Sequence, residues 1–119
     1  MINDTNRTRY ISTDLMSLRH RLTRFEDEQI RYADHGALEP HVDQQFQSYL
    51  MAAYDGTEPV IAKTRVGWRL LRATRNNRAA ARTLHGMAQL AVAEVLRLRK
   101  KCPATLRSFL QQYCFKVHM

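Results

Sequence analysis

Residues 70–101 read LLRATRNNRAAARTLHGMAQLAVAEVLRLRKK, and this stretch decides the fold that we expect. It contains the longest apolar periodic run in the chain. Beyond Asn77, a helical wheel separates apolar side chains from polar and basic ones. One helix of roughly two dozen residues explains both sides. The apolar side holds Ala80, Leu84, Met87, Ala88, Ala91, Val95 and Leu98, and the opposite side holds Arg78, Arg82, His85, Gln89 and Lys100.

The sequence also marks where this helix begins and ends. Asn76-Asn77 predicts a break before it, because Asn caps helices and tolerates turn conformations. Lys100-Lys101 suit its C-terminus through the helix dipole, and Pro103 then starts a last short helix. The inward positions of that last helix are Leu106, Phe109, Leu110 and Tyr113.

Towards the N-terminus, a second apolar stripe predicts another long helix. Its members are spaced by three or four residues, and Gly36 is a natural stop. The stripe has two interpretations: it packs on its own domain, or it forms a short coiled coil between two copies, a homodimer. The stripe consists of Ile11, Leu15, Leu18, Leu22, Phe25, Gln29 and Tyr32, of which Ile11, Leu15, Leu18, Leu22 and Phe25 are the self-association candidates.

Two more helices are predicted between these stretches. One begins near Pro40, ends at Asp55-Gly56 and turns Val42, Phe46, Tyr49, Leu50 and Ala53 inward. The next opens at Thr57-Glu58-Pro59 and turns Ile61, Thr64, Trp68 and Leu71 inward, with Arg65, Arg69 and Arg72 on an adjacent face. We therefore expect an all-α, compact four- or five-helix bundle-like single domain over residues 11–119, preceded by a flexible N-terminal arm over residues 1–10.

Composition limits the class of protein. A chain of 119 residues with 45% apolar and 25% charged residues is typical of one soluble globular domain. No run approaches the ~20 apolar residues of a membrane span, and the N-terminus lacks an export signal. We expect a cytoplasmic protein that does not enter the membrane.

Charge is distributed unevenly along the chain. Residues 1–62 hold 6 Arg against 10 Asp and Glu, whereas residues 63–119 hold 13 Lys and Arg against Glu94 alone. Such asymmetry favours a basic footprint for nucleic acid or for an acidic protein surface, although the two halves could instead neutralise each other by packing. The predicted binding residues are Arg65, Arg69, Arg72, Arg75, Arg78 and Arg82.

Part of the same stretch resembles the Fis-type helix-turn-helix of bacterial regulators. Leu71, Asn76, Ala80-Ala81 and Leu84 follow that order, and Gly86 would serve as the second turn glycine. The resemblance implies DNA binding through a helix after Gly86. It covers about a quarter of the chain. Arg75 stands in place of the turn glycine, His85 is inserted before Gly86, and residues 88–94 lack the usual base-reading polar positions.

Metal and enzyme signatures are weak or missing. Cys102, Cys114 and His118 do not have the close ligand pairs of structural zinc sites, and His35 and His41 flank a turn without a third ligand. There is no phosphate loop, nucleophile elbow or His-Glu-x-x-His pair. We expect a non-enzymatic protein without cofactor or metal.

Two functions remain open at the level of the sequence. The first is a nucleic-acid-binding regulatory or accessory protein that uses the arginine surface. The alternative is a protein-binding adaptor or inhibitor, such as a small phage- or plasmid-type factor, whose basic face covers an acidic protein surface.

Overall fold

Helices account for all regular structure in the residues that the computed structural model describes, 4–56 and 65–118; side chains are described for residues 14–56 and 69–114. Within these ranges no helix is both long and apolar enough to cross a bilayer. The predicted all-α bundle is confirmed. The helices are α1 (Asp4–Asp34), α2 (Val42–Asp55), α3 (Arg65–Ala73), α4 (Arg78–Lys101) and α5 (Pro103–His118).

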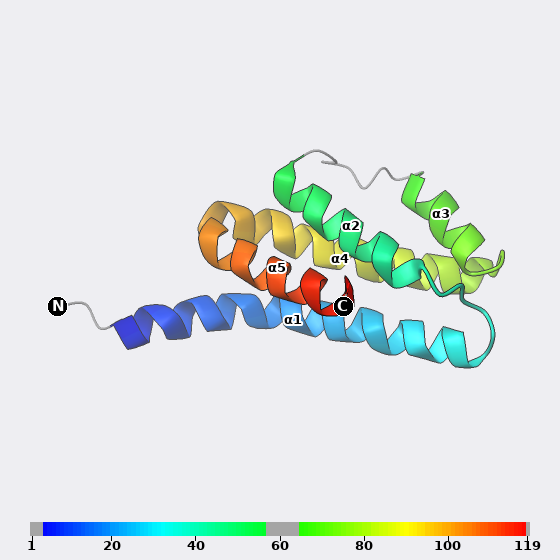
Figure 1. The fold of residues 1–119 in the computed structure, drawn as a ribbon, viewed down its shortest axis with the longest axis horizontal. Helices are drawn as coiled ribbons and strands as arrows, with labels where there is room; N and C mark the ends of the chain where they lie inside the picture. The colour runs from blue at the N-terminus through cyan, green and yellow to red at the C-terminus, as the bar shows by residue number, and fades with distance from the viewer. Residues whose placement is uncertain (1–3, 57–64, 119) are drawn as a thin grey trace.

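The fold is organised around α4. This helix packs against each of the other four, running between α1 on one side and α2 and α3 on the other (Figure 1). After α4 the chain breaks at Cys102, and α5 folds back along the bundle from Pro103, as predicted. Proline fits the first turn of a helix but disfavours helical geometry at the residue before it. The longest apolar run in the sequence thus becomes the central element.

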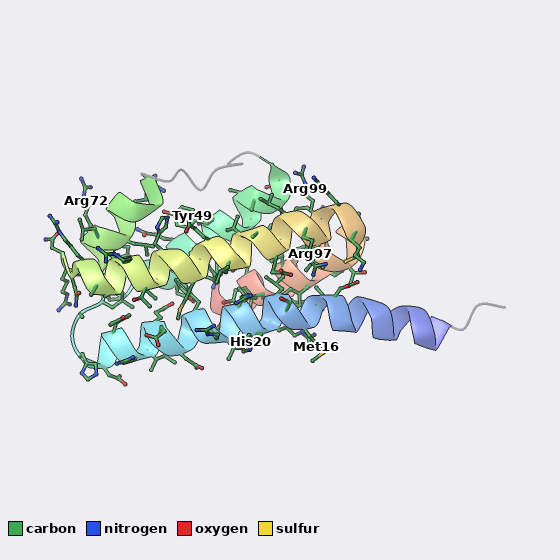
Figure 2. All side chains as sticks on the ribbon, turned by 180° about the vertical axis from the view of Figure 1, so that it is seen from behind. Met16, His20, Tyr49, Arg72, Arg97 and Arg99 are labelled. Carbon is green, nitrogen blue, oxygen red and sulfur yellow. The ribbon has the colours of Figure 1, made fainter. Side chains whose placement is uncertain are left out.

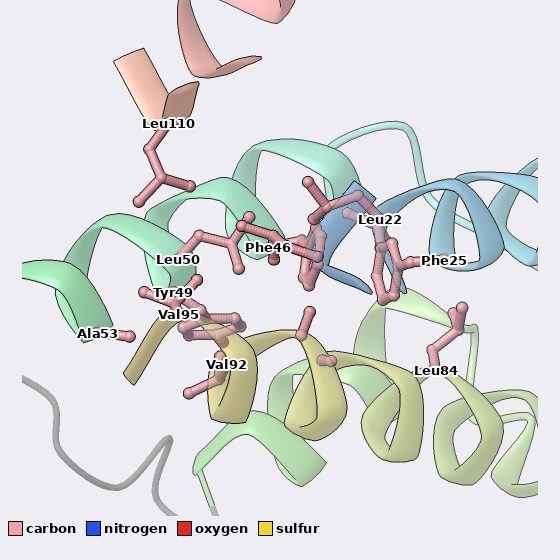
Figure 3. Close-up of a cluster of buried hydrophobic side chains, with 14 of the residues drawn as sticks. Leu22, Phe25, Phe46, Tyr49, Leu50, Ala53, Leu84, Val92, Val95 and Leu110 are labelled. Carbon is pink, nitrogen blue, oxygen red and sulfur yellow. The ribbon is translucent and has the colours of Figure 1, made fainter. Parts of the chain in front are cut away.

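The core lies where α1, α2 and α5 meet α4. Phe25 of α1 stacks on Phe46 of α2, with ring centroids 3.8 Å apart and an interplanar angle of 12°. Val92 and Val95 of α4 and Leu110 of α5 belong to the same buried cluster (Figure 3). Of the apolar side predicted for α4, Met87 is half-buried and the other six members are buried. The wheel missed Ala81 and Val92, which are also buried because α4 has neighbours on several sides.

The N-terminal stripe is used by the chain's own core. Leu15, Leu18, Leu22 and Phe25 are at most 6% exposed, and Tyr32 packs partly buried against them. The side chain of Ile11 lies outside the described residues. The described leucines and Phe25 of the stripe thus pack within the domain. The homodimer remains an untested prediction.

Most predicted boundaries are confirmed. Gly36 ends α1 and Gly56 ends α2, with φ angles of 70° and 72° that favour glycine. The start of α1 differs from the predicted one: the helix begins at Asp4, whereas we expected a flexible arm over residues 1–10. Extending an existing helix adds a hydrogen bond per residue without a new nucleation cost, so polar residues can continue it. The predicted opening of the third helix at residues 57–59 lies outside the described residues.

The break at Asn76-Asn77 is confirmed, but no second break follows it. α4 runs without interruption through His85 and Gly86, so the turn required by the helix-turn-helix resemblance is absent. Gly86 does not have a positive φ angle. The local reason is that Leu84, Ala88 and Ala91 form one continuous buried stripe across this glycine, which favours an unbroken helix.

Candidate nucleic-acid interface

A tight turn joins α3 to α4 and sets the geometry of the candidate site. The buried Thr74 hydroxyl closes the end of α3 by donating to the Leu70 carbonyl at 2.7 Å. Backbone N–H groups of Arg75 and Asn76 bond back to the carbonyls of Arg72 and Leu71, the pattern of a Schellman motif. Asn77 then caps α4, its side-chain oxygen accepting from the Ala80 N–H at 3.1 Å.

Four arginines flank this turn with their side chains in solvent. Arg69 and Arg72 lie on α3, and Arg78 and Arg82 lie on the first turns of α4. None of the four forms an ion pair or a side-chain hydrogen bond within the described part of the chain. Figure 2 shows Arg72 projecting outward at this end of the molecule. We call this set of four residues the basic corner.

Arg75 is in the same turn but has a structural role that the sequence did not reveal. Its Nη1 donates to the Gly36 carbonyl at 2.7 Å, and its Nε donates to Glu39 Oε1 at 3.1 Å. These contacts tie the α3–α4 turn to the loop between α1 and α2. Arg75 also adopts a left-handed conformation, with φ at 54°, which costs energy for any residue with a Cβ. The two side-chain contacts offset that cost. The side chain of Arg65, the remaining predicted member, lies outside the described residues.

A hollow of about 270 Å³ opens between α3 and α4 inside the basic corner. Leu71 supplies its wall on α3, and Ala81, Arg78, Arg82 and His85 line it from α4. The Nε2 atom of His85 is shielded from solvent and makes no hydrogen bond to the described residues. Burial lowers the pKa of this imidazole from its ordinary value, so it is neutral at neutral pH. The hollow therefore combines apolar surface, two cations and an uncharged imidazole.

Sequence reasoning did not predict the hollow, although the spacing of its three polar lining residues is visible in the sequence. Arg78, Arg82 and His85 fall at positions i, i+4 and i+7, which share one helix face. The sequence did not show that Leu71 of α3 would oppose that face, since this depends on how the two helices pack. His85 was grouped with exposed polar residues and is instead half-buried.

Further positive charge lies at the other end of α4. Arg97 pairs with Glu94 at 2.9 Å, and Lys101 pairs with Asp14 of α1 at 3.0 Å. Arg82 and Arg97 are 15 positions apart, which is about 22 Å along a helix that rises ~1.5 Å per residue. Figure 2 places Arg97 and Arg99 near the end of α4 opposite to Arg72. The described cations of the basic half thus form two separate regions. Arg99 and Arg107 also have no ion pair among the described residues, but only the basic corner gathers four unpaired arginines around one turn.

The other candidate sites do not assemble among the described residues. No group of three or more His, Cys, Asp or Glu residues in the described ranges could hold a metal ion. Cys114 is buried and Cys102 is half-buried, both as free thiols whose pKa values are raised by burial. The side chain of His118 lies beyond the last described side chain. His35 and His41 are exposed on either side of the α1–α2 connection.

Comparison with known proteins gives no relative for this chain. No protein-family model, no curated protein and no solved structure matches it.

Proposed function

We propose that this protein binds nucleic acid through the basic corner, as a non-enzymatic regulatory or accessory factor. The observation that carries the proposal is the set of four exposed arginines, Arg69, Arg72, Arg78 and Arg82, that lie around one helix turn without a carboxylate partner in the described residues. Arginine forms planar, two-pronged hydrogen bonds to phosphate, and clustered arginines neutralise successive phosphates of a nucleic-acid backbone.

The proposed contact is with the backbone and not with base pairs in a groove. The unbroken α4 supports this, because the resemblance to a helix-turn-helix placed its reading helix after a turn at Gly86, and that turn does not exist. Four phosphate contacts predict that log K falls with log salt at a slope of about −3.6 on duplex DNA and about −2.8 on a single strand.

The test is a binding titration followed by fluorescence anisotropy at several salt concentrations. Between about 50 and 200 mM NaCl, the wild-type protein should lose roughly 150-fold in affinity for duplex DNA, or roughly 50-fold for a single strand. Changing Arg69, Arg72 and Arg78 to Glu should abolish the binding.

A matched control separates the corner from net charge. Changing Arg99, Lys100 and Arg107 to Glu alters the total charge equally, but at the other end of α4 and on α5. This control should retain a steep salt slope and most of the affinity. Equal loss in both triple variants would show that only net charge matters, and absence of wild-type binding would refute the proposed function.

The hollow also supports a second candidate, an adaptor whose basic face covers an acidic protein surface. Leu71 and Ala81 lie beside Arg78 and Arg82 there, and apolar area next to arginine is typical of protein-binding sites. Nucleic acid that stays with the protein through purification, seen as a raised 260/280 absorbance ratio, favours the first function. A clean preparation that captures one protein from lysate at physiological salt favours the second.

A further inference from the structure

The hollow between α3 and α4 is larger than a phosphate group needs. Its accessible volume of about 270 Å³ far exceeds the ~10–15 Å³ in this measure that one water molecule needs. It is close to the lower limit of ~300 Å³ for pockets that hold whole small molecules. A ligand fragment of the size of one nucleobase fits this range better than a bare anion or a complete cofactor.

The lining has the chemistry that receives an unpaired base. Leu71 and Ala81 give apolar contact to a flat ring, and the imidazole of His85 and the guanidinium of Arg82 are planar groups of the kind on which unpaired bases stack. The Nε2 atom of His85 is shielded from solvent, so the contact offered to a base is the exposed part of the imidazole ring and not a hydrogen bond to this atom. Arg78 at the edge of the hollow provides charge for the adjoining phosphate.

We propose that this hollow seats one unpaired base of a single-stranded nucleic acid, with Arg78 and Arg82 on the flanking phosphates and Arg69 and Arg72 along the continuing backbone. This proposal rests on the proposed function and names its substrate class. A base within a duplex is paired and stacked, so it enters such a hollow only after costly extrusion, whereas a single strand presents its bases freely.

The experiment compares three labelled probes of equal length: an oligothymidine, an abasic oligonucleotide with the same phosphates, and a duplex of the oligothymidine with oligoadenine. Fluorescence anisotropy at one salt concentration gives the three dissociation constants. The wild-type protein should bind oligothymidine about tenfold or more tightly than the abasic strand, and more tightly than the duplex.

Two variants should remove this preference without removing binding. H85A deletes the imidazole, and A81M places a larger side chain into the hollow. Both should bring the affinity for oligothymidine to within about twofold of that for the abasic strand. The control Q89A changes an exposed residue one turn further along α4, outside the hollow, and should leave the preference intact. Thermal unfolding by circular dichroism checks that each variant is folded. H85A removes side-chain volume from the hollow and A81M adds it, so a loss of preference in both does not come from one kind of packing change.

The outcomes distinguish the two proposals. Salt-sensitive binding without preference for oligothymidine over the abasic strand overturns the base-seating proposal but leaves the proposed function standing. Absence of binding to all three probes overturns both. Displacement of oligothymidine by an oligoglutamate peptide at lower concentration than by the abasic strand also overturns the base-seating proposal, in favour of an acidic protein.

Discussion

Replacing Gly86 with alanine should stabilise this protein. Gly86 lies inside α4 with a φ angle outside the left-handed region, and a Cβ added there meets no atom within 4 Å. In a helix interior alanine is favoured over glycine by up to ~1 kcal/mol, partly because glycine leaves more freedom to the unfolded chain. We expect the free energy of unfolding to rise by about 0.5–1 kcal/mol and the melting temperature by roughly 2–5 °C.

The matched control adds the same methyl group at Gly36. A Cβ there also meets nothing within 4 Å, but φ is +70°, so G36A should destabilise by about 1 kcal/mol through backbone strain alone. Urea unfolding followed by far-UV circular dichroism, with an unchanged m value, measures both variants. If G86A lost stability as G36A does, Gly86 would require a left-handed turn. The unbroken α4 would then be refuted and the helix-turn-helix interpretation would return.

Further predictions concern the turn, the core and one tyrosine. R75A should lower the free energy of unfolding by about 1–2 kcal/mol because it loses the contacts to Gly36 and Glu39. R75G should lose less stability, because glycine relieves the strain of the left-handed backbone. Equal losses of the two variants in a urea titration would contradict this. F46A should lower the free energy of unfolding by about 3–5 kcal/mol, since Phe46 is 1% exposed and stacks in the core. A loss below about 1 kcal/mol in the same assay would be inconsistent with that packing. Burial, followed by the hydrogen bond to a glutamate of α1, raises the pKa of Tyr113, so the folded state favours the neutral phenol. The stabilisation from the neutral Tyr113 phenol is fully present below the ordinary pKa of about 10 and is lost as pH rises above it. Urea midpoints should therefore fall from about pH 10 upward less steeply in Y113F than in the wild type.

The proposed site shows where reasoning from the sequence reached its limit. The spacing of the arginines correctly identified exposed residues on α3 and α4, because exposure on a helix follows from local periodicity. It could not separate Arg75 from Arg72. Arg75 reaches Glu39, which is 36 positions away in the chain, and only the packing of the α1–α2 loop against the α3–α4 turn brings them together.

The charge pattern has the same limit. The sequence predicted a basic half, yet an ion pair depends on distance in space and not on position along the chain. Lys101 is paired with Asp14, 87 positions away, while Arg78 and Arg82 have no such partner among the described residues. Counting charges along the chain therefore could not show which cations are paired, and only the structure showed that Arg75, Arg97 and Lys101 have carboxylate partners.

The sequence by itself determined the helices, the break at Asn76-Asn77, the end at Gly56 and the buried stripes, because these depend on contacts between residues a few positions apart. The periodic pattern also predicted the one long helix that runs through Gly86 as α4. Only the tertiary structure decided that the described apolar members of the N-terminal stripe pack inside one chain, and that Leu71 faces Arg78, Arg82 and His85 across a hollow. The physical reason is that a periodic pattern fixes which face of a helix is apolar, whereas the partner of that face is chosen by packing among all five helices.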